Sequence, residues 1–216
     1  MELTDAQLRE EICAIGEKVW RSGMVAANDG NISFRCDDGT VLCTPTGVSK
    51  GALSPRAICR VDPEGNTLEE FDGCKVSSEV KVHLRLYREA QHVRAVVHAH
   101  PPYATAFAIG GETIISKMMP ENIIAMPVIP VAPYATPSTY ELADNIAPFV
   151  NDYPCCLMEM HGALAWADTL LGAYQVMERL EYTAKLTAIT RQLGLVRELD
   201  EAEIQKLIAM RPQYGF

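Results

Sequence analysis

Residues 95–102 read Ala-Val-Val-His-Ala-His-Pro-Pro, a short apolar run that carries two histidines and stops at two prolines. This composition predicts a buried strand followed by a proline-initiated helix that reaches about Ile109. Successive side chains of a strand point to opposite faces, so His98 and His100 project from the same face. Their imidazoles can therefore converge on one ion.

Two further residues could complete a metal site around this pair. His161 lies at the end of another expected strand, and Gly162 after it allows a second backbone segment to approach closely. Glu79 stands in the first turn of an expected helix, where the helix dipole favours its charge. Three neutral imidazoles and one displaceable carboxylate suit a catalytic Zn²⁺ ion. Spacing alone leaves an alternative open, because a His-x-His pair on an apolar strand is also typical of two buried, hydrogen-bonded histidines.

The remaining two histidines are weaker candidates. His83 and His92 fall on or just after a helix expected from Ser77 to about Ala90, among lysine, arginine and glutamate residues. We interpret both as solvent-exposed or supporting groups rather than as first-choice metal ligands.

Length and composition narrow the class of protein. A chain of 216 residues favours one domain over residues 1–216. Hydrophobic residues make up 48% and charged residues 22%, which excludes a disordered or fibrous chain. The net charge of −9 repels nucleic acid and anionic lipid surfaces, so we expect a small-molecule substrate and neither of those partners.

Cysteine usage and the N-terminal sequence bear on location. The seven cysteines are scattered and form no C-x-x-C pair, which is typical of reduced thiols. Residues 1–5 resemble no signal peptide, and no run approaches 18 uninterrupted apolar residues. We therefore expect a cytoplasmic protein with no membrane-spanning segment.

Hydrophobic periodicity, capping residues and turn signals predict an α/β or α+β protein whose sheet is covered by helices. Helices are expected at residues 4–23, 77–90, 101–109, 138–150, 168–192 and 202–210, with Ser138 and Asp168 as N-terminal caps of two of them. Strands are expected at residues 32–35, 40–43, 59–62, 67–71, 95–100, 128–131, 155–160 and 163–166.

Three turn segments carry small hydrogen-bond donors that could cradle a phosphate. They are Gly30-Asn31, Thr44-Pro45-Thr46-Gly47 and Ser77-Ser78. Hydroxyl, amide and backbone N–H donors at turns and helix starts bind phosphate without an overall basic protein. Each segment taken alone is equally typical of a structural turn or cap. Lys50 could add positive charge beside them, or it could be a solvated loop lysine.

In their order along the chain, these motifs resemble the class II aldolase/adducin family. This resemblance implies a three-layer α/β/α fold with a central, mostly antiparallel sheet. It also implies a C4 homotetramer with one Zn²⁺ per subunit, at subunit interfaces. The segments that carry the resemblance are Gly30-Asn31-Ile32-Ser33, Thr44-Pro45-Thr46-Gly47, Ser77-Ser78-Glu79, His98-Ala99-His100-Pro101, Ala132-Pro133-Tyr134 and His161-Gly162.

The resemblance also assigns roles to these residues. It makes Glu79 the base that contacts zinc before substrate arrives, and Tyr134 the proton donor that a neighbouring subunit lends to the site. Tyr214 in the C-terminal tail is a further candidate, although no motif anchors that comparison. The implied zinc ligands are His98, His100 and His161, and the implied phosphate-binding residues are Gly30, Asn31, Thr46, Gly47, Ser77 and Ser78.

Within the family, the pattern is most similar to the zinc-dependent aldolases that cleave a ketose 1-phosphate such as L-fuculose 1-phosphate. Such enzymes release dihydroxyacetone phosphate and a small aldehyde, and zinc stabilises the enediolate formed when the C3–C4 bond breaks. Ribulose-5-phosphate 4-epimerases are an alternative, but they typically carry aspartate where this chain has Glu79. Decarboxylases of phospho-sugar acids and a thioribulose-phosphate dehydratase share the histidine motif. A non-catalytic, adducin-like interaction module would lack the three histidines that are present here.

Overall fold

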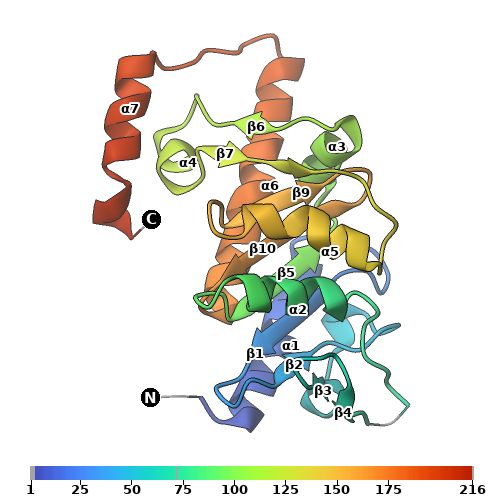
Figure 1. Ribbon diagram of the computed structural model, residues 1–216. Helices are drawn as coiled ribbons and strands as arrows, with labels where there is room; N and C mark the ends of the chain where they lie inside the picture. Colours follow the sequence, from blue (N-terminus) through green and yellow to red (C-terminus); the bar gives the residue numbers. More distant parts are fainter. Residues whose placement is uncertain (1–2, 72, 216) are drawn as a thin grey trace.

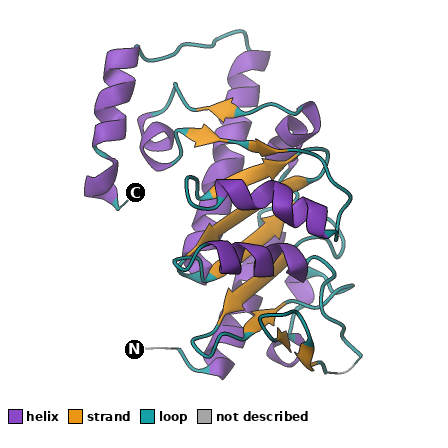
Figure 2. Ribbon diagram, in the orientation of Figure 1, coloured by secondary structure: helices purple, strands orange, loops and turns teal. Residues whose placement is uncertain are grey.

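A central eight-stranded sheet forms the frame of the protein (Figures 1 and 2). The structure is a computed structural model that describes residues 3–71 and 73–215. Neighbouring strands pair antiparallel throughout, except for the parallel pair β8 and β9. The strand order is β4 (Thr67–Glu69), β3 (Cys59–Val61), β2 (Val41–Cys43), β1 (Asn31–Arg35), β5 (Ala95–Ala99), β10 (Gly162–Ala167), β9 (Cys155–Met158) and β8 (Val131–Ala132).

Helices cover both faces of this sheet and give three layers. Alternate residues of β5 enter two separate hydrophobic cores: Ala95 and Val97 pack in one, and Val96 packs in the other. The expected α/β/α architecture with a mostly antiparallel sheet is therefore confirmed. The first core contains residues of α1 (Asp5–Arg21), α3 (Pro102–Gly110) and α6 (Leu170–Gln192), and the second contains residues of α2 (Val80–Glu89) and α5 (Tyr140–Ile146).

Smaller elements extend the structure beyond these layers. The C-terminal helix α7 stands beside α4 at the periphery of the molecule (Figure 1), and Arg211 donates to the backbone oxygen of Ile124 at 2.9 Å. These elements are β6 (Ile114–Ile115), β7 (Val128–Ile129), α4 (Pro120–Ala125), α7 (Glu201–Ala209) and the 3₁₀ turns η1 (Lys50–Ala52), η2 (Pro55–Ala57), η3 (Ala147–Phe149) and η4 (Arg211–Tyr214).

Two helix caps differ from the sequence prediction by one residue. Thr139, rather than Ser138, accepts the capping hydrogen bond of α5, and Ser138 instead adopts a left-handed φ of 65°. Thr169, rather than Asp168, caps α6. In both places two adjacent residues could serve as the cap, and the path of the incoming chain selects between them.

Prolines account for two other differences. The proline-broken strand expected at 128–131 contributes to two different sheets, since Pro130 separates β7 from β8. The helix expected to reach Val150 ends at Ile146 and continues as a 3₁₀ turn that contains Pro148. The short elements β6 and α4 were not expected from the sequence. No helix in the described ranges combines the length and apolar character needed to cross a membrane.

A core substitution tests the placement of β9. Leu157 is fully buried in the first core, so Leu157→Ala should lower the free energy of unfolding by about 2–5 kcal/mol. The matched control Leu195→Ala removes a side chain that is 69% exposed, and it should change that free energy by less than about 0.5 kcal/mol. Urea unfolding followed by circular dichroism measures both, and equal losses would contradict the burial of Leu157.

Candidate metal and substrate site

Three histidines meet at one end of the central strands. His98 is the fourth of the five buried residues of β5, His100 is the first residue after that strand, and His161 immediately precedes β10. One nitrogen of each ring lies within 4.8 Å of the others, and the Nε2 atoms of His98 and His100 are 3.2 Å apart. A Cβ atom on Gly162 would lie 2.6 Å from Cδ2 of His100, so glycine is needed for this close approach. The structure therefore brings together the three histidines that the sequence singled out.

Glu79 joins the cluster from the start of α2. Its Oε2 is 3.1 Å from Nε2 of His98, and its Oε1 is 3.5 Å from Nε2 of His161. Asn31 lies opposite His98 in the β1–β5 pairing and donates its Nδ2–H to Oε2 of Glu79 at 2.9 Å. Burial raises the pKa of Glu79, but the hydrogen bond and charge of His98, the Asn31 bond and the charge of His161 together lower it well below its usual value. Glu79 is thus held as a carboxylate.

The histidine rings are arranged so that Nε2 faces the shared space. His98 donates Nδ1–H to the backbone oxygen of Ala163 at 2.9 Å, which fixes the ring with Nε2 directed toward the cluster. Burial, followed by the charge of His98, lowers the pKa of His161 to about 4. The same causes, in the same order, lower the pKa of His100. His161 and His100 therefore favour the neutral form that a metal ligand needs.

This donor set fits a bound divalent metal. Ligand atoms 2.0–2.1 Å from a tetrahedral Zn²⁺ ion lie roughly 3.4 Å apart. The separations of 3.1, 3.2 and 3.5 Å among the Glu79, His98, His100 and His161 atoms are close to that spacing. Three imidazole nitrogens and one carboxylate oxygen are also ligands that zinc accepts.

The three expected phosphate segments lie side by side next to Glu79. The backbone N–H of Thr46 donates to the oxygen of Lys75 at 2.8 Å, and a β-bridge joins Pro45 to Val76. The Thr44 hydroxyl accepts from the N–H of Ile32 at 3.1 Å, which ties the same turn to β1. Exposed donors along this surface belong to Thr46, Gly47 and Ser78, whereas Asn31 and Ser77 are buried beside Glu79.

The environment of Lys50 matches neither of the two roles that the sequence suggested. Its side chain is only 1% exposed, so it is not a solvated loop lysine. Nζ donates to the backbone oxygens of Asn28 at 3.1 Å and Val48 at 2.7 Å. Both hydrogen bonds engage the ammonium group that could have bound a phosphate. Lys50 instead links the two loops that contain Asn28 and Val48.

His83 is buried, which excludes the solvent-exposed alternative and leaves that of a supporting group, while His92 is exposed. Nδ1 of His83 and the Tyr87 hydroxyl each lie 2.6 Å from the hydroxyl oxygen of Ser33. Burial lowers the pKa of His83 to about 3, the charge of His98 adds to the decrease, and the charge of Glu79 opposes it. His83 is thus a neutral core residue behind the cluster.

The two candidate tyrosines lie apart from the histidines in this chain. Tyr134 is 53% exposed, and its backbone N–H donates to Oε2 of Glu159 at 2.9 Å. Tyr214 is 58% exposed in η4, beside α4. Within the described ranges neither hydroxyl forms a hydrogen bond to the cluster.

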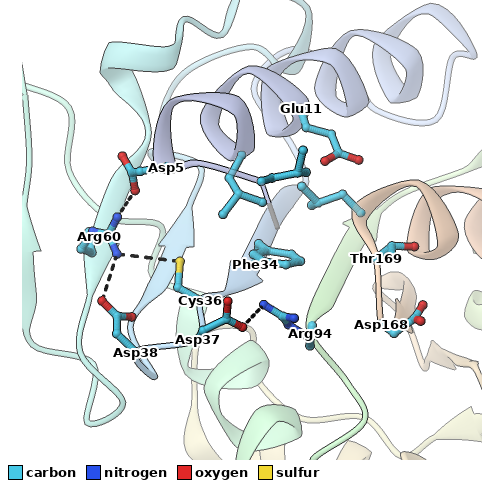
Figure 3. A pocket seen from close by; sticks show the side chains of 13 residues that line it. Asp5, Glu11, Phe34, Cys36, Asp37, Asp38, Arg60, Arg94, Asp168 and Thr169 are labelled. Atoms are coloured by element: carbon cyan, nitrogen blue, oxygen red, sulfur yellow. Dashed lines mark hydrogen bonds and ion pairs between the residues drawn. The ribbon is translucent and has the colours of Figure 1, made fainter. Parts of the chain in front are cut away.

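A separate cavity of about 540 Å³ lies between the start of α1, the β1–β2 hairpin and the start of α6 (Figure 3). Both arginines in its lining are already paired with carboxylates: Arg60 with Asp5, and Arg94 with Asp37 at 2.5 Å. The rest of the lining is mainly apolar or acidic, and it includes Leu8, Phe34 and Glu11. This cavity is therefore less suited to an anionic substrate than the histidine site is.

Asp29 is a residue that the motif analysis missed. Its Oδ2 lies 3.4 Å from Nδ1 of His100, on the side of the ring away from the cluster. The only signal in the sequence was a carboxylate directly before Gly30-Asn31, and spacing alone could not connect it to a histidine 71 positions later.

Comparisons with known proteins agree with this geometry. Residues 10–188 match the class II aldolase and adducin N-terminal domain, and the chain belongs to that family. It is 33% identical over 207 residues to the 3-oxo-tetronate 4-phosphate decarboxylase of Escherichia coli K12, covering 94% of this chain and 96% of that protein. It is 32% identical over 210 residues to the 5-deoxy-D-ribulose 1-phosphate aldolase of Bacillus thuringiensis, covering 96% of each chain. A solved L-fuculose 1-phosphate aldolase superposes with a TM-score of 0.87 at 28% identity, covering 97% of each chain.

The burial of His83 predicts an acid-sensitive contribution to stability. The unfolded chain takes up a proton on this residue near pH 6.5, whereas the folded chain resists it until about pH 3. Stability therefore falls as the pH decreases through this window. In metal-free protein, His83→Gln should reduce the slope of the free energy of unfolding against pH between pH 6.5 and 5. The reduction should be at most the amount that corresponds to uptake of about one proton on unfolding. Chemical unfolding at several pH values measures the slope; His92→Gln should keep the wild-type slope, and an unchanged slope in His83→Gln would contradict the assignment.

Proposed function

We propose that the protein is a metal-dependent decarboxylase of a 3-oxo-tetronate 4-phosphate or a closely similar phospho-sugar acid. One observation carries the proposal: the start of α2 presents Ser77 and Ser78 beside the phosphate turns and Glu79 beside the histidines. A substrate with a phosphate at one end and adjacent hydroxyl and keto groups could span both parts. The similarity to the Escherichia coli decarboxylase over nearly the whole chain supports this reaction.

The proposed reaction breaks the bond between C1 and C2 of the substrate. The electron pair passes to the C3 carbonyl oxygen and gives an enediolate, CO₂ leaves, and a proton then adds to C2 to give dihydroxyacetone phosphate. A divalent metal held by His98, His100, His161 and Glu79 would supply the positive charge that polarises the carbonyl and stabilises the enediolate. The segments Gly30-Asn31, Thr44-Pro45-Thr46-Gly47 and Ser77-Ser78 would orient the substrate phosphate through uncharged hydroxyl, amide and backbone N–H donors.

Glu79 is the residue that we assign to proton movement. It lies at the cluster, and Asn31 fixes the direction of its carboxylate. Release from His98 and His161 would remove the contacts that lower its pKa, which would let it carry a proton to the substrate carbon.

Aldol cleavage of a ketose 1-phosphate is the second candidate, and the sequence motifs alone placed it first. It releases the same enediolate of dihydroxyacetone phosphate, with an aldehyde as the other fragment. The similarity to the Bacillus thuringiensis aldolase and to the solved L-fuculose 1-phosphate aldolase favours it. We place decarboxylation first because the decarboxylase relative matches with 33% identity over 94% of this chain, against 32% over 96% for the aldolase.

A substrate comparison tests the function directly. Purified metal-loaded protein is assayed for dihydroxyacetone phosphate, CO₂ and aldehyde with 3-oxo-tetronate 4-phosphate, L-fuculose 1-phosphate and 5-deoxy-D-ribulose 1-phosphate. We expect the highest kcat/KM for the acid, with CO₂ and dihydroxyacetone phosphate in equal amounts. A higher kcat/KM with either ketose phosphate, accompanied by aldehyde, would select the aldolase instead.

Glu79→Gln should separate binding from chemistry. The amide retains an oxygen that can face the metal but cannot carry the proton, so turnover should fall by about 10²–10⁴ while metal content stays near wild type. Elemental analysis and steady-state kinetics measure the two effects. Glu64→Gln, in an exposed turn, is the control and should keep full turnover. Wild-type turnover in Glu79→Gln would place the proton carrier elsewhere.

Tyr134→Phe should distinguish the two reactions. Tyr134 is exposed, and we propose that it serves the site of a neighbouring subunit in a homotetramer. Aldol cleavage must move a proton at the oxygen of the departing aldehyde, whereas CO₂ leaves without one. The substitution should therefore reduce cleavage of a ketose 1-phosphate more than decarboxylation of the acid. Equal losses in kcat for both substrates, with the oligomer intact by light scattering, would contradict this role.

A further inference from the structure

The loop of residues 24–30 lies directly against the histidine end of β5. The backbone N–H of His100 donates to the oxygen of Met24 at 2.9 Å. At the other end of the loop, Gly30 has a φ of 75°, and a Cβ atom there would lie 2.7 Å from the backbone oxygen of His98. The loop is thus fitted to the backbone of both histidines, and a side chain within it can reach their rings.

The carboxylate of Asp29 lies on the side of the His100 ring that points away from the cluster. One nitrogen of the His100 ring, Nε2, lies 3.2 Å from Nε2 of His98, inside the cluster. The other nitrogen, Nδ1, lies 3.4 Å from Oδ2 of Asp29. The equivalent nitrogen of His98 donates to the backbone oxygen of Ala163. Two of the three rings therefore have an oxygen acceptor behind them, and the acceptor behind His100 carries a charge.

Lys50 holds the loop that carries Asp29. Its buried Nζ donates to the oxygen of Asn28, the residue before Asp29, and to the oxygen of Val48 beyond the Thr46 turn. Burial lowers the pKa of Lys50 to about 8, and the negative charge of Asp29 opposes that decrease. A buried cation is stable only with acceptors and a nearby anion, so Lys50 and Asp29 stabilise one another across the loop.

We propose that Asp29 is a positioning residue for the metal site, and that Lys50 fixes the loop from which it acts. Asp29 accepts Nδ1–H of His100, so that Nε2 keeps its lone pair directed into the cluster. A carboxylate behind a ligating histidine fixes its tautomer and increases its basicity, and loss of such a partner typically weakens metal binding 10–100-fold. The inference rests on the metal-dependent function proposed above.

Zinc affinity of the full-length chain tests the proposal. Metal-free protein is titrated with Zn²⁺ against a chromophoric chelator. Asp29→Ala should weaken binding about 10–100-fold, and Asp29→Asn should weaken it less, because its amide oxygen still accepts the N–H but carries no charge. Asp152→Ala removes an exposed carboxylate from a distant turn and should bind zinc as the wild type does. Lys50→Met should weaken binding in the same direction as Asp29→Ala.

A second measurement separates orientation of the ring from general support of the loop. The chain has five histidines, so ¹⁵N-labelled imidazoles can be assigned individually. In metal-free protein, His100 should be the Nδ1–H tautomer in the wild type and a mixture in Asp29→Ala. Wild-type zinc affinity or an unchanged His100 tautomer in Asp29→Ala would overturn the role of Asp29. If that variant does not fold, wild-type affinity in Asp29→Asn overturns it, and wild-type affinity in Lys50→Met overturns the role of Lys50.

His161→Ala distinguishes failure of this inference from failure of the proposed function. Loss of zinc binding in His161→Ala together with unchanged binding in Asp29→Ala would leave the metal site in place and remove only the role of Asp29. Unchanged binding in His161→Ala would instead contradict the metal site itself. Neither result depends on which substrate the enzyme uses.

Discussion

The pairing of β5 with β1 on one side and β10 on the other is the constraint on which the rest of the site depends. It sets Asn31 opposite His98 and places Gly162 beside the segment that carries His100. Adjacent strands lie about 4.8 Å apart, so side chains at the same end of three neighbouring strands must gather. Glycine at positions 30 and 162 lets the backbones come close enough, because a Cβ atom at either position would collide with β5 or the residue after it.

Charge inside the site is balanced locally rather than by the protein as a whole. Glu79 is largely buried, which by itself would favour the neutral acid, but its contacts with His98 and Asn31 keep it ionised. The turns around Thr46 and Ser78 expose hydroxyl and backbone N–H groups, and such donors can bind an anion even in a chain with a net charge of −9. Lys50, three residues after Gly47, instead binds the backbone oxygens of Asn28 and Val48.

The same geometry suits more than one reaction. Decarboxylation and aldol cleavage both give the enediolate of dihydroxyacetone phosphate, and the residues that would hold this fragment are the same in each case. The two reactions differ in the group that departs, CO₂ or an aldehyde. Selection between them must therefore depend on residues around that group rather than on the histidine cluster.

Patterns among residues close together in the sequence predicted most of the helices and strands and the histidines of the candidate site. Alternation along residues 95–100 predicted that His98 and His100 share a face, and helical periodicity with turn residues predicted the main elements of the three layers. Motifs in a fixed order indicated the family and the residues of the site. These features are visible in sequence because each depends on residues a few positions apart.

Only the tertiary structure decided which groups are buried and which distant groups meet. The sequence left Lys50 as either a loop lysine or a phosphate partner and placed His83 on a polar helix, but packing buries both side chains. It gave no sign that Asp29 faces His100, because that contact is made by a loop folded against a strand 71 residues away. Burial and long-range contact depend on how whole elements pack, and the free energies involved are sums over many neighbours that no local pattern contains.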